Sequence, residues 1–224
     1  MLITGASKGL GRELALAFAK SGVDVIVHGR DEGDLAEVER RVTACGVTCE
    51  VVRGELTDEE TLDRLELAGS RAEVEVLVNN AGIYWNESLA EMTPSSLRRV
   101  LDVNLVAPIL LTQRLLPVFK KNGSGLVVSI NSFAGLQGSD GEAAYCASKH
   151  GLRGFTRSFR FEALRDQVLV LDVYLGAMNT DMAANRKDPE KCIQPAEVAD
   201  LILDLCRDYR SMRLDEVHLG RLKY

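Results

Sequence analysis

The sequence has few of the features that place a protein in a membrane, outside the cell or on a nucleic acid. No apolar run is long enough to span a bilayer, and the opening residues, Met1-Leu2-Ile3-Thr4-Gly5, lack the basic start and apolar stretch of a signal peptide. The net charge of −6 at pH 7 gives no long-range attraction for a polyanion. We therefore expect a cytoplasmic protein with neither a membrane nor a nucleic acid as partner.

The sequence also lacks paired cysteines, since its five cysteines show no CxxC spacing. Without such pairs we expect no bound metal, no disulfide framework, and thiols that stay reduced. Cys146 borders Tyr145, but neighbouring side chains on a helix point in different directions, so packing is the better interpretation. The cysteines are Cys45, Cys49, Cys146, Cys192 and Cys206.

The length and the order of apolar segments indicate one α/β domain covering residues 1–224. A chain of 224 residues with 46% hydrophobic and 27% charged residues is ordinary for a globular protein with a large core. Apolar runs alternate with helical patterns, which predicts right-handed βαβ units and a doubly wound, Rossmann-like parallel sheet of about seven strands with helices on both faces. The expected strands cover residues 1–3, 23–27, 49–53, 74–78, 126–130, 168–174 and 214–218.

A glycine-rich turn joins the first expected strand to a helix. It runs from Thr4 through Gly5, Gly9 and Gly11, and an apolar stripe begins at Leu10. Glycines let backbone amides approach a pyrophosphate at a helix N-terminus, where unpaired N–H groups favour an anion. A tight strand-to-helix connection without a ligand is the alternative.

The end of the second strand bears on the cofactor. Dinucleotide-binding folds place there an acidic residue for the ribose 2′-hydroxyl, or an arginine for a 2′-phosphate. Here Gly29 stands where the acid is expected and Arg30 follows it, while Lys8 lies in the glycine turn. NADP(H) is therefore favoured over NAD(H), which stays open because Asp31 is only one position away; Arg30 as a solvated loop charge is the other alternative.

A long helical segment over residues 95–122 contains Asn104 in an apolar stretch, followed by Pro108 and Pro117. Each proline removes a backbone donor, so we expect a bend or an irregular turn at both. Asn104 either caps a carbonyl at the Pro108 irregularity or serves a site. Ser132 follows the strand 126–130, at the edge where open α/β sheets bind ligands.

Tyr145 and Lys149 lie four residues apart, on one face of an expected helix. At about 4 Å and an effective dielectric of about 20, a cation stabilises a tyrosinate by roughly 4 kcal/mol. That would lower a phenol pKa of about 10 towards roughly 7, the range of a general acid or base. By itself the pair also fits a partly solvated helix face.

Taken together, these residues resemble the short-chain dehydrogenase/reductase family, in its compact single-domain, 3-oxoacyl reductase-like form. The turn from Thr4 to Gly11 matches the family's Thr-Gly-x-x-x-Gly-x-Gly motif, and Asn79-Asn80-Ala81-Gly82 matches its strand-four motif. Ser132, Tyr145-x-x-x-Lys149 and the helix residue Asn104 follow in the family's order along nearly the whole chain.

The resemblance implies an oxidoreductase that interconverts a small carbonyl and an alcohol. Tyr145 would be the general acid or base, Ser132 would orient the carbonyl oxygen, and Lys149 would hold the nicotinamide ribose and lower the tyrosine pKa. Asn104, through its backbone, would bind a water linking Lys149 to solvent. The implied cofactor contacts are Gly5, Ser7, Lys8, Gly9, Leu10, Gly11, Arg30, Glu55, Leu56, Asn79, Gly82, Tyr145, Lys149, Gly176 and Thr180.

Three positions depart from the family pattern. Glu55 replaces the usual Asp near the adenine, Leu175-Gly176 replaces Pro-Gly, and Asn131 replaces a frequent serine. The C-terminal residues after Gly220 also lack the family's glycine-rich close. The loop above the nicotinamide and the substrate pocket are where differences are expected.

Candidate substrates are 3-oxoacyl thioesters or related small ketones. Basic residues at 186, 187 and 191 would receive an anionic handle or form a solvated loop. Two other hypotheses stay open: a low-turnover NAD(P)-binding scaffold or sensor, and, less favoured, an epimerase or dehydratase. The family also implies a homodimer or homotetramer through helices 95–122 and 144–165. Candidate pocket side chains are Tyr84, Trp85, Phe133, Leu136, Tyr174 and Met178.

Overall fold

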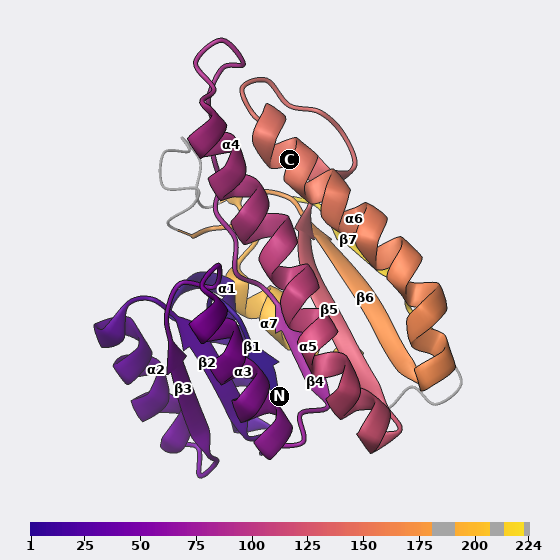
Figure 1. The fold of residues 1–224 in the computed structure, drawn as a ribbon. Helices are drawn as coiled ribbons and strands as arrows, with labels where there is room; N and C mark the ends of the chain where they lie inside the picture. Colours follow the sequence, from indigo (N-terminus) through magenta and orange to yellow (C-terminus); the bar gives the residue numbers. More distant parts are fainter. Residues whose placement is uncertain (181–190, 207–212, 222–224) are drawn as a thin grey trace.

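The computed structural model describes residues 1–180, 191–206 and 213–221. At its centre is a parallel sheet of seven strands in the order β3-β2-β1-β4-β5-β6-β7 (Figure 1). The chain moves outward from β1 to β3 and then returns to build β4 to β7 on the other side. This confirms the doubly wound, Rossmann-like fold. The strands are β1 (Leu2–Ile3), β2 (Val25–Gly29), β3 (Cys49–Arg53), β4 (Val76–Asn79), β5 (Gly125–Ser132), β6 (Val168–Leu175) and β7 (Glu216–Leu219).

The strands form where apolar runs can be covered on both faces. All of β2 is buried, as are Leu77 and Val78 in β4. The second strand starts two residues later than predicted because Val23 belongs to the turn that ends the preceding helix, where its N–H donates to Phe18 O at 3.1 Å. Apolar character alone does not distinguish a strand from such a turn.

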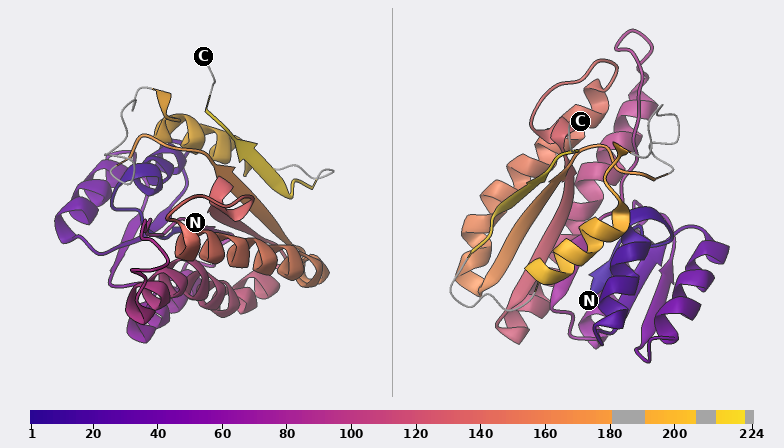
Figure 2. Two further views of the ribbon diagram at one scale, coloured as in Figure 1. Left: turned by 90° about the horizontal axis from the view of Figure 1, so that it is seen from above. Right: turned by 180° about the vertical axis from the view of Figure 1, so that it is seen from behind.

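Helices cover both faces of the sheet (Figures 1 and 2). The core on one face includes buried residues of α1, α2 and α7, and the core on the other includes residues of α3, α5 and α6. Between β1 and β4 the order in which the chain adds strands to the sheet reverses, and a cavity lies there at the carboxyl ends of the strands. The helices are α1 (Gly9–Lys20), α2 (Glu32–Thr43), α3 (Glu59–Arg71), α4 (Pro94–Leu101), α5 (Ala107–Asn122), α6 (Ala143–Ala163) and α7 (Pro195–Leu205).

The long helical segment is irregular at one of its two prolines. A π-helical turn, η1 (Asp102–Val106), separates α4 from α5, and it precedes Pro108, which has no N–H for the carbonyl of Asn104. The prediction of a bend or an irregular turn is confirmed there, whereas at Pro117 the helix α5 continues without interruption. Leu115 and Phe119 are fully buried on either side of Pro117, and this packing holds the helix through it.

By length and composition, one segment would suffice to cross a membrane, contrary to the expectation from sequence. It is the 29-residue stretch Pro94–Asn122. In the fold its apolar side chains Leu111, Leu115 and Phe119 are buried in the core beneath the sheet. Core packing therefore accounts for the apolar character of these three side chains.

Candidate active site

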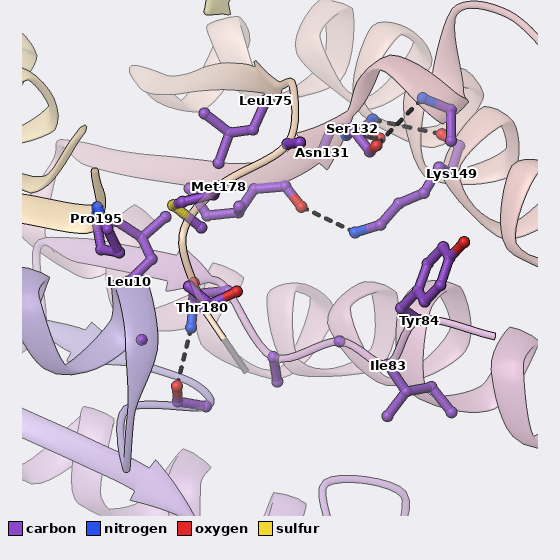
Figure 3. Close-up of a pocket in the computed structure, with 18 of the residues that line it drawn as sticks. Leu10, Ile83, Tyr84, Asn131, Ser132, Lys149, Leu175, Met178, Thr180 and Pro195 are labelled. Carbon is purple, nitrogen blue, oxygen red and sulfur yellow. Dashed lines mark hydrogen bonds between the residues drawn. The ribbon is translucent and has the colours of Figure 1, made fainter. Parts of the chain in front are cut away.

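A cavity of about 1680 Å³ lies at the carboxyl ends of the strands, and it holds most of the predicted site residues. It extends from the glycine turn after β1 to Tyr145 on α6. In the close-up, Leu10, Thr180 and Pro195 lie on one side, and Lys149 and Tyr84 lie on the other (Figure 3). One continuous space thus joins the predicted nucleotide end to the predicted carbonyl end.

The glycine turn is shaped for a ligand that approaches the backbone. Gly9 opens α1 with φ of 56°, a left-handed value that favours glycine. A Cβ on Gly11 would lie 2.2 Å from Gly5 O, so only glycine lets the helix come this close to the turn. The first turn of α1 carries no acidic residue. This open, amide-lined helix N-terminus fits the pyrophosphate of a dinucleotide.

Asn80 braces this turn from the neighbouring strand, a role that the sequence did not reveal. Its Nδ2 donates to Thr4 O at 2.9 Å and to Gly5 O at 3.0 Å, and it lines the cavity. Asn79, which was predicted to contact the cofactor, instead donates to Thr112 Oγ1 at 3.0 Å and does not line the cavity. Side chains alternate across a strand, so of these neighbours only Asn80 faces the ligand side.

The adenosine end of the cavity contains Arg30, Glu55 and Leu56, as predicted from sequence. Arg30 Nη1 lies 3.3 Å from Glu55 Oε1, and both side chains are half exposed. Glu55 therefore neutralises part of the charge that a 2′-phosphate would meet. An exposed pair of this kind contributes little to stability, so Arg30 can change partner at small cost.

His28 is a further residue of this end that the sequence reading missed. It is buried at the end of β2, where its Nδ1 accepts from Gly5 N at 3.4 Å and its Nε2 lies 3.1 Å from Gly54 O. These two contacts place the proton on Nε2. Burial lowers the pKa of His28 to about 4, so it is neutral near pH 7 and ties the glycine turn to the loop after β3.

Ser132, Tyr145 and Lys149 come together at the other end of the cavity. Ser132 ends β5, and its side chain acts on the phenol of Tyr145, whose pKa it lowers. Lys149 Nζ lies 5.9 Å from the centroid of the Tyr145 ring and donates to Ile130 O at 3.0 Å. A phenol, a hydroxyl and an ammonium thus share one wall.

The pKa of Tyr145 differs from the sequence expectation. Burial raises it to about 12, although the hydrogen bond from Ser132 acts in the opposite direction. Burial also lowers the pKa of Lys149 to about 8, while the nearby charge of Asp172 opposes this change. The predicted lowering of the tyrosine pKa is therefore wrong for the protein groups alone, because desolvation by burial is the largest influence on it.

Asn104 lies behind the cavity wall rather than on it. Its Oδ1 accepts from Ile83 N at 2.8 Å, and its Nδ2 donates to Ile83 O at 2.9 Å and to Ser148 Oγ at 3.2 Å. A Cβ on Gly82 would lie 3.2 Å from Asn104 Oδ1 and 3.8 Å from Lys149 Nζ. The Asn104 side chain thus holds the loop after β4 against α6, close to Lys149.

Asn131 performs a similar task beside Ser132. Its Oδ1 accepts from Ser132 N at 2.8 Å, and its Nδ2 lies 3.4 Å from Lys149 O. Sequence reasoning noted Asn131 only as a departure from the family pattern. Its contacts fix the strand end that presents Ser132.

Of the other residues predicted for the site, some line the cavity and others do not. Gly176, Thr180 and Lys191 line the cavity, whereas residues 186 and 187 lie outside the described residues. Gly11 packs behind the glycine turn and does not line the cavity. Of the six candidate pocket side chains, Tyr84, Phe133 and Met178 line it, while Trp85, Leu136 and Tyr174 do not.

Comparison with known proteins agrees with this arrangement. The family model described as short chain dehydrogenase matches residues 1–191. A 3-oxoacyl-[acyl-carrier-protein] reductase of Synechocystis is 33% identical over 218 residues, covering 92% of this chain and 88% of that protein. An L-xylulose reductase of Caenorhabditis elegans is 34% identical, covering 85% of this chain and 76% of that protein.

Solved structures share the whole architecture. A 3-oxoacyl (acyl-carrier-protein) reductase of Agrobacterium tumefaciens with NADP bound superimposes with a TM-score of 0.89 at 31% identity, covering 97% of this chain and 91% of that one. A metagenomic short-chain oxidoreductase in complex with NADP gives 0.87 at 29% identity, covering 100% and 96%. With its fold, its motifs and these relatives in agreement, the chain belongs to the short-chain dehydrogenase family of oxidoreductases.

Proposed function

We propose that this protein is an NADP(H)-dependent oxidoreductase that interconverts a carbonyl and a secondary alcohol, with Tyr145 as the general acid or base. The observation that carries the proposal is the continuity of one cavity from the glycine turn and Arg30 to Ser132, Tyr145 and Lys149. A dinucleotide bound along it would supply the hydride. The NADP-bound relatives support the choice of cofactor.

Side chains of the protein supply the proton to the carbonyl oxygen of the substrate and orient that oxygen. Because the pKa of Tyr145 is raised to about 12, the phenol is protonated near pH 7 and can donate to a carbonyl oxygen. Ser132 acts on the same phenol, whose pKa it lowers, and would orient the carbonyl oxygen. Lys149 would hold the nicotinamide ribose, and the backbone of Asn104 would bind a water that links Lys149 with solvent.

At the other end, the amides of the glycine turn hold the pyrophosphate, and Arg30 with Lys8 meets the 2′-phosphate. Leu56 and Glu55 would hold the adenine, and Thr180 would hold the carboxamide. NAD(H) is the alternative cofactor. We propose 3-oxoacyl thioesters or related small ketones as substrates, which the relationship to 3-oxoacyl reductases supports. A cytoplasmic location and a homodimer or homotetramer stay predictions.

The test is NADPH consumption by the purified protein with a panel of small ketones and 3-oxoacyl esters, together with identification of the product. We expect one secondary alcohol for each NADPH oxidised. NADPH binding without consumption would instead favour a scaffold or sensor. Product formed without net consumption of NADPH would favour an epimerase or dehydratase.

A further inference from the structure

The cavity carries a carboxylate close to Tyr145 that the reaction described above does not use. Glu142 lines the cavity at the residue before α6, three positions ahead of Tyr145. Residues three apart on a helix are neighbours on one face. The charge of Glu142 acts on Tyr145, where it raises the pKa of the phenol.

Tyr84 fixes this carboxylate in place. Its hydroxyl donates to Glu142 Oε1 at 2.8 Å, and its ring lies against that of Tyr145 in an edge-to-face arrangement, with centroids 5.3 Å apart. The three side chains therefore form one connected group. Tyr84 is visible in Figure 3 on the same side of the pocket as Lys149.

Backbone contacts between two loops hold this group together. The loop after β4 and the loop before α6 lie side by side (Figure 1), and Glu87 N donates to Gly141 O at 2.8 Å. Asn86 Nδ2 also lies 3.4 Å from Asp140 O. Contacts between the two loops thus fix the position of Glu142.

Lys149 forms no ion pair with Glu142. The two residues lie on opposite sides of Tyr145 along α6, seven positions apart, which is roughly 10 Å along a helix axis. Lys149 Nζ is directed to Ile130 O. The ion pairs found among the described residues do not include Glu142. A substrate at Tyr145 therefore meets a negative charge on the Glu142 side.

We propose that the Tyr84–Glu142 pair determines the charge of the substrate: the site accepts 3-oxo compounds whose carboxyl group is masked as an ester or thioester and rejects the free 3-oxo acids. This inference rests on the proposed function and names its substrate class. A free carboxylate near the reacting carbonyl is repelled by Glu142, whereas a neutral ester is not. Glu142 and Tyr84 are specificity residues here, and Tyr145 remains the acid.

The experiment compares kcat/KM for methyl acetoacetate and for acetoacetate in four proteins: wild type, Glu142→Gln, Glu142→Asp and Glu162→Gln. Glutamine still accepts the Tyr84 hydrogen bond but removes the charge, and aspartate keeps it. Glu162 is an exposed residue of the same helix that does not line the cavity, so its variant is the matched control for net charge.

We expect the ester to be preferred in the wild type and the preference to fall by roughly five- to tenfold in Glu142→Gln. Glu142→Asp and Glu162→Gln should keep the wild-type preference. An unchanged preference in Glu142→Gln overturns the inference, as does an equal loss in Glu142→Asp, which would indicate a structural role. In both of these outcomes the wild type still reduces the ester, so the proposed function stands. A wild type that is inactive on both compounds overturns the proposed function and, with it, this inference.

Discussion

Two buried cations lie on the same helix, and their surroundings differ. Lys149 and Arg160 of α6 are 6% and 8% exposed, so burial is nearly the same for both. Arg160 is paired: its Nη2 lies 3.3 Å from Asp172 Oδ2 and donates to Asp215 O at 2.8 Å, and its Nε donates to Val170 O. Lys149 donates to the carbonyl of Ile130, and among the described residues it forms no ion pair.

The difference indicates that the charge of Arg160 stabilises the fold, whereas the charge of Lys149 serves the site. A buried charge is costly unless it is paired and hydrogen-bonded. Arg160 satisfies that condition at the junction of α6, β6 and the start of β7. Lys149 does not, and it faces the cavity beside Tyr145. Under-compensated buried charges are typical of functional sites.

Among the tests of this comparison, removing the charge of Lys149 gives the largest expected effect. In Lys149→Met we expect kcat/KM for ketone reduction to fall by about 10³-fold, within the range of acid–base contributions. The free energy of unfolding should stay unchanged or rise, because methionine avoids the cost of burying an ammonium. Steady-state kinetics and urea titration measure the two quantities. A strongly destabilised variant would contradict the comparison.

Removing the charge of Arg160 should have the opposite effects: it should lower the free energy of unfolding and leave kcat/KM nearly unchanged. Arg160→Met leaves Asp172 buried with Thr156 Oγ1, at 2.6 Å, as its remaining hydrogen-bond partner. We expect a loss of about 3–5 kcal/mol in the free energy of unfolding. The folded fraction should keep kcat/KM within about twofold, since Arg160 does not line the cavity. Loss of activity in fully folded protein would break the distinction.

The pH dependence of stability sharpens the comparison further. Burial raises the pKa of Asp172 from its ordinary 3.8 to about 6, despite the Thr156 hydrogen bond and the charge of Arg160. The folded protein then binds more protons than the unfolded chain between these values, so stability is full below 3.8 and falls as pH rises through 6.

In Asp172→Asn this dependence should disappear. Relative to the variant, the wild type should lose on the order of 1–3 kcal/mol of unfolding free energy between pH 4 and 6.5. Urea titrations at several pH values provide the measurement. Parallel pH curves for the two proteins would show that Asp172 titrates normally in the fold.

The smallest expected effect is that of removing an exposed cation, Arg30, at the far end of the cavity. Arg30 is half exposed and paired with Glu55, so Arg30→Ala should change stability by less than about 1 kcal/mol. We expect roughly tenfold weaker NADPH binding, the effect of one charge-assisted phosphate contact, and little change for NADH. Fluorescence titration with both cofactors checks this. Equal losses for the two would refute the 2′-phosphate role.

The sequence predicted best what depends on local spacing. The four-residue interval of Tyr145 and Lys149, the glycine turn and the irregular turn before Pro108 are all short-range patterns, and they form as expected. The parallel order of strands followed from their alternation with helices. These features need no knowledge of distant contacts.

What the sequence could not predict depends on burial and on strand ends. The raised pKa of Tyr145 reflects desolvation by parts of the chain far away in sequence. Whether Asn79 or Asn80 faces the cavity depends on the residue at which β4 ends. His28 lies in an apolar run, and its contact with Gly5 appears only once β1 and β2 are paired. The feature that could have identified His28 in the sequence is a histidine at the end of an apolar strand that follows the glycine turn.

The most direct test of the account is NADPH-dependent ketone reduction in Tyr145→Phe, with NADPH affinity measured on the same preparation. Phenylalanine keeps the ring that packs against Tyr84 and removes only the proton donor. We predict that turnover falls by at least about 10³-fold while the dissociation constant for NADPH changes by less than about threefold. Turnover near the wild-type rate with normal NADPH binding would contradict the assignment of Tyr145 as the acid.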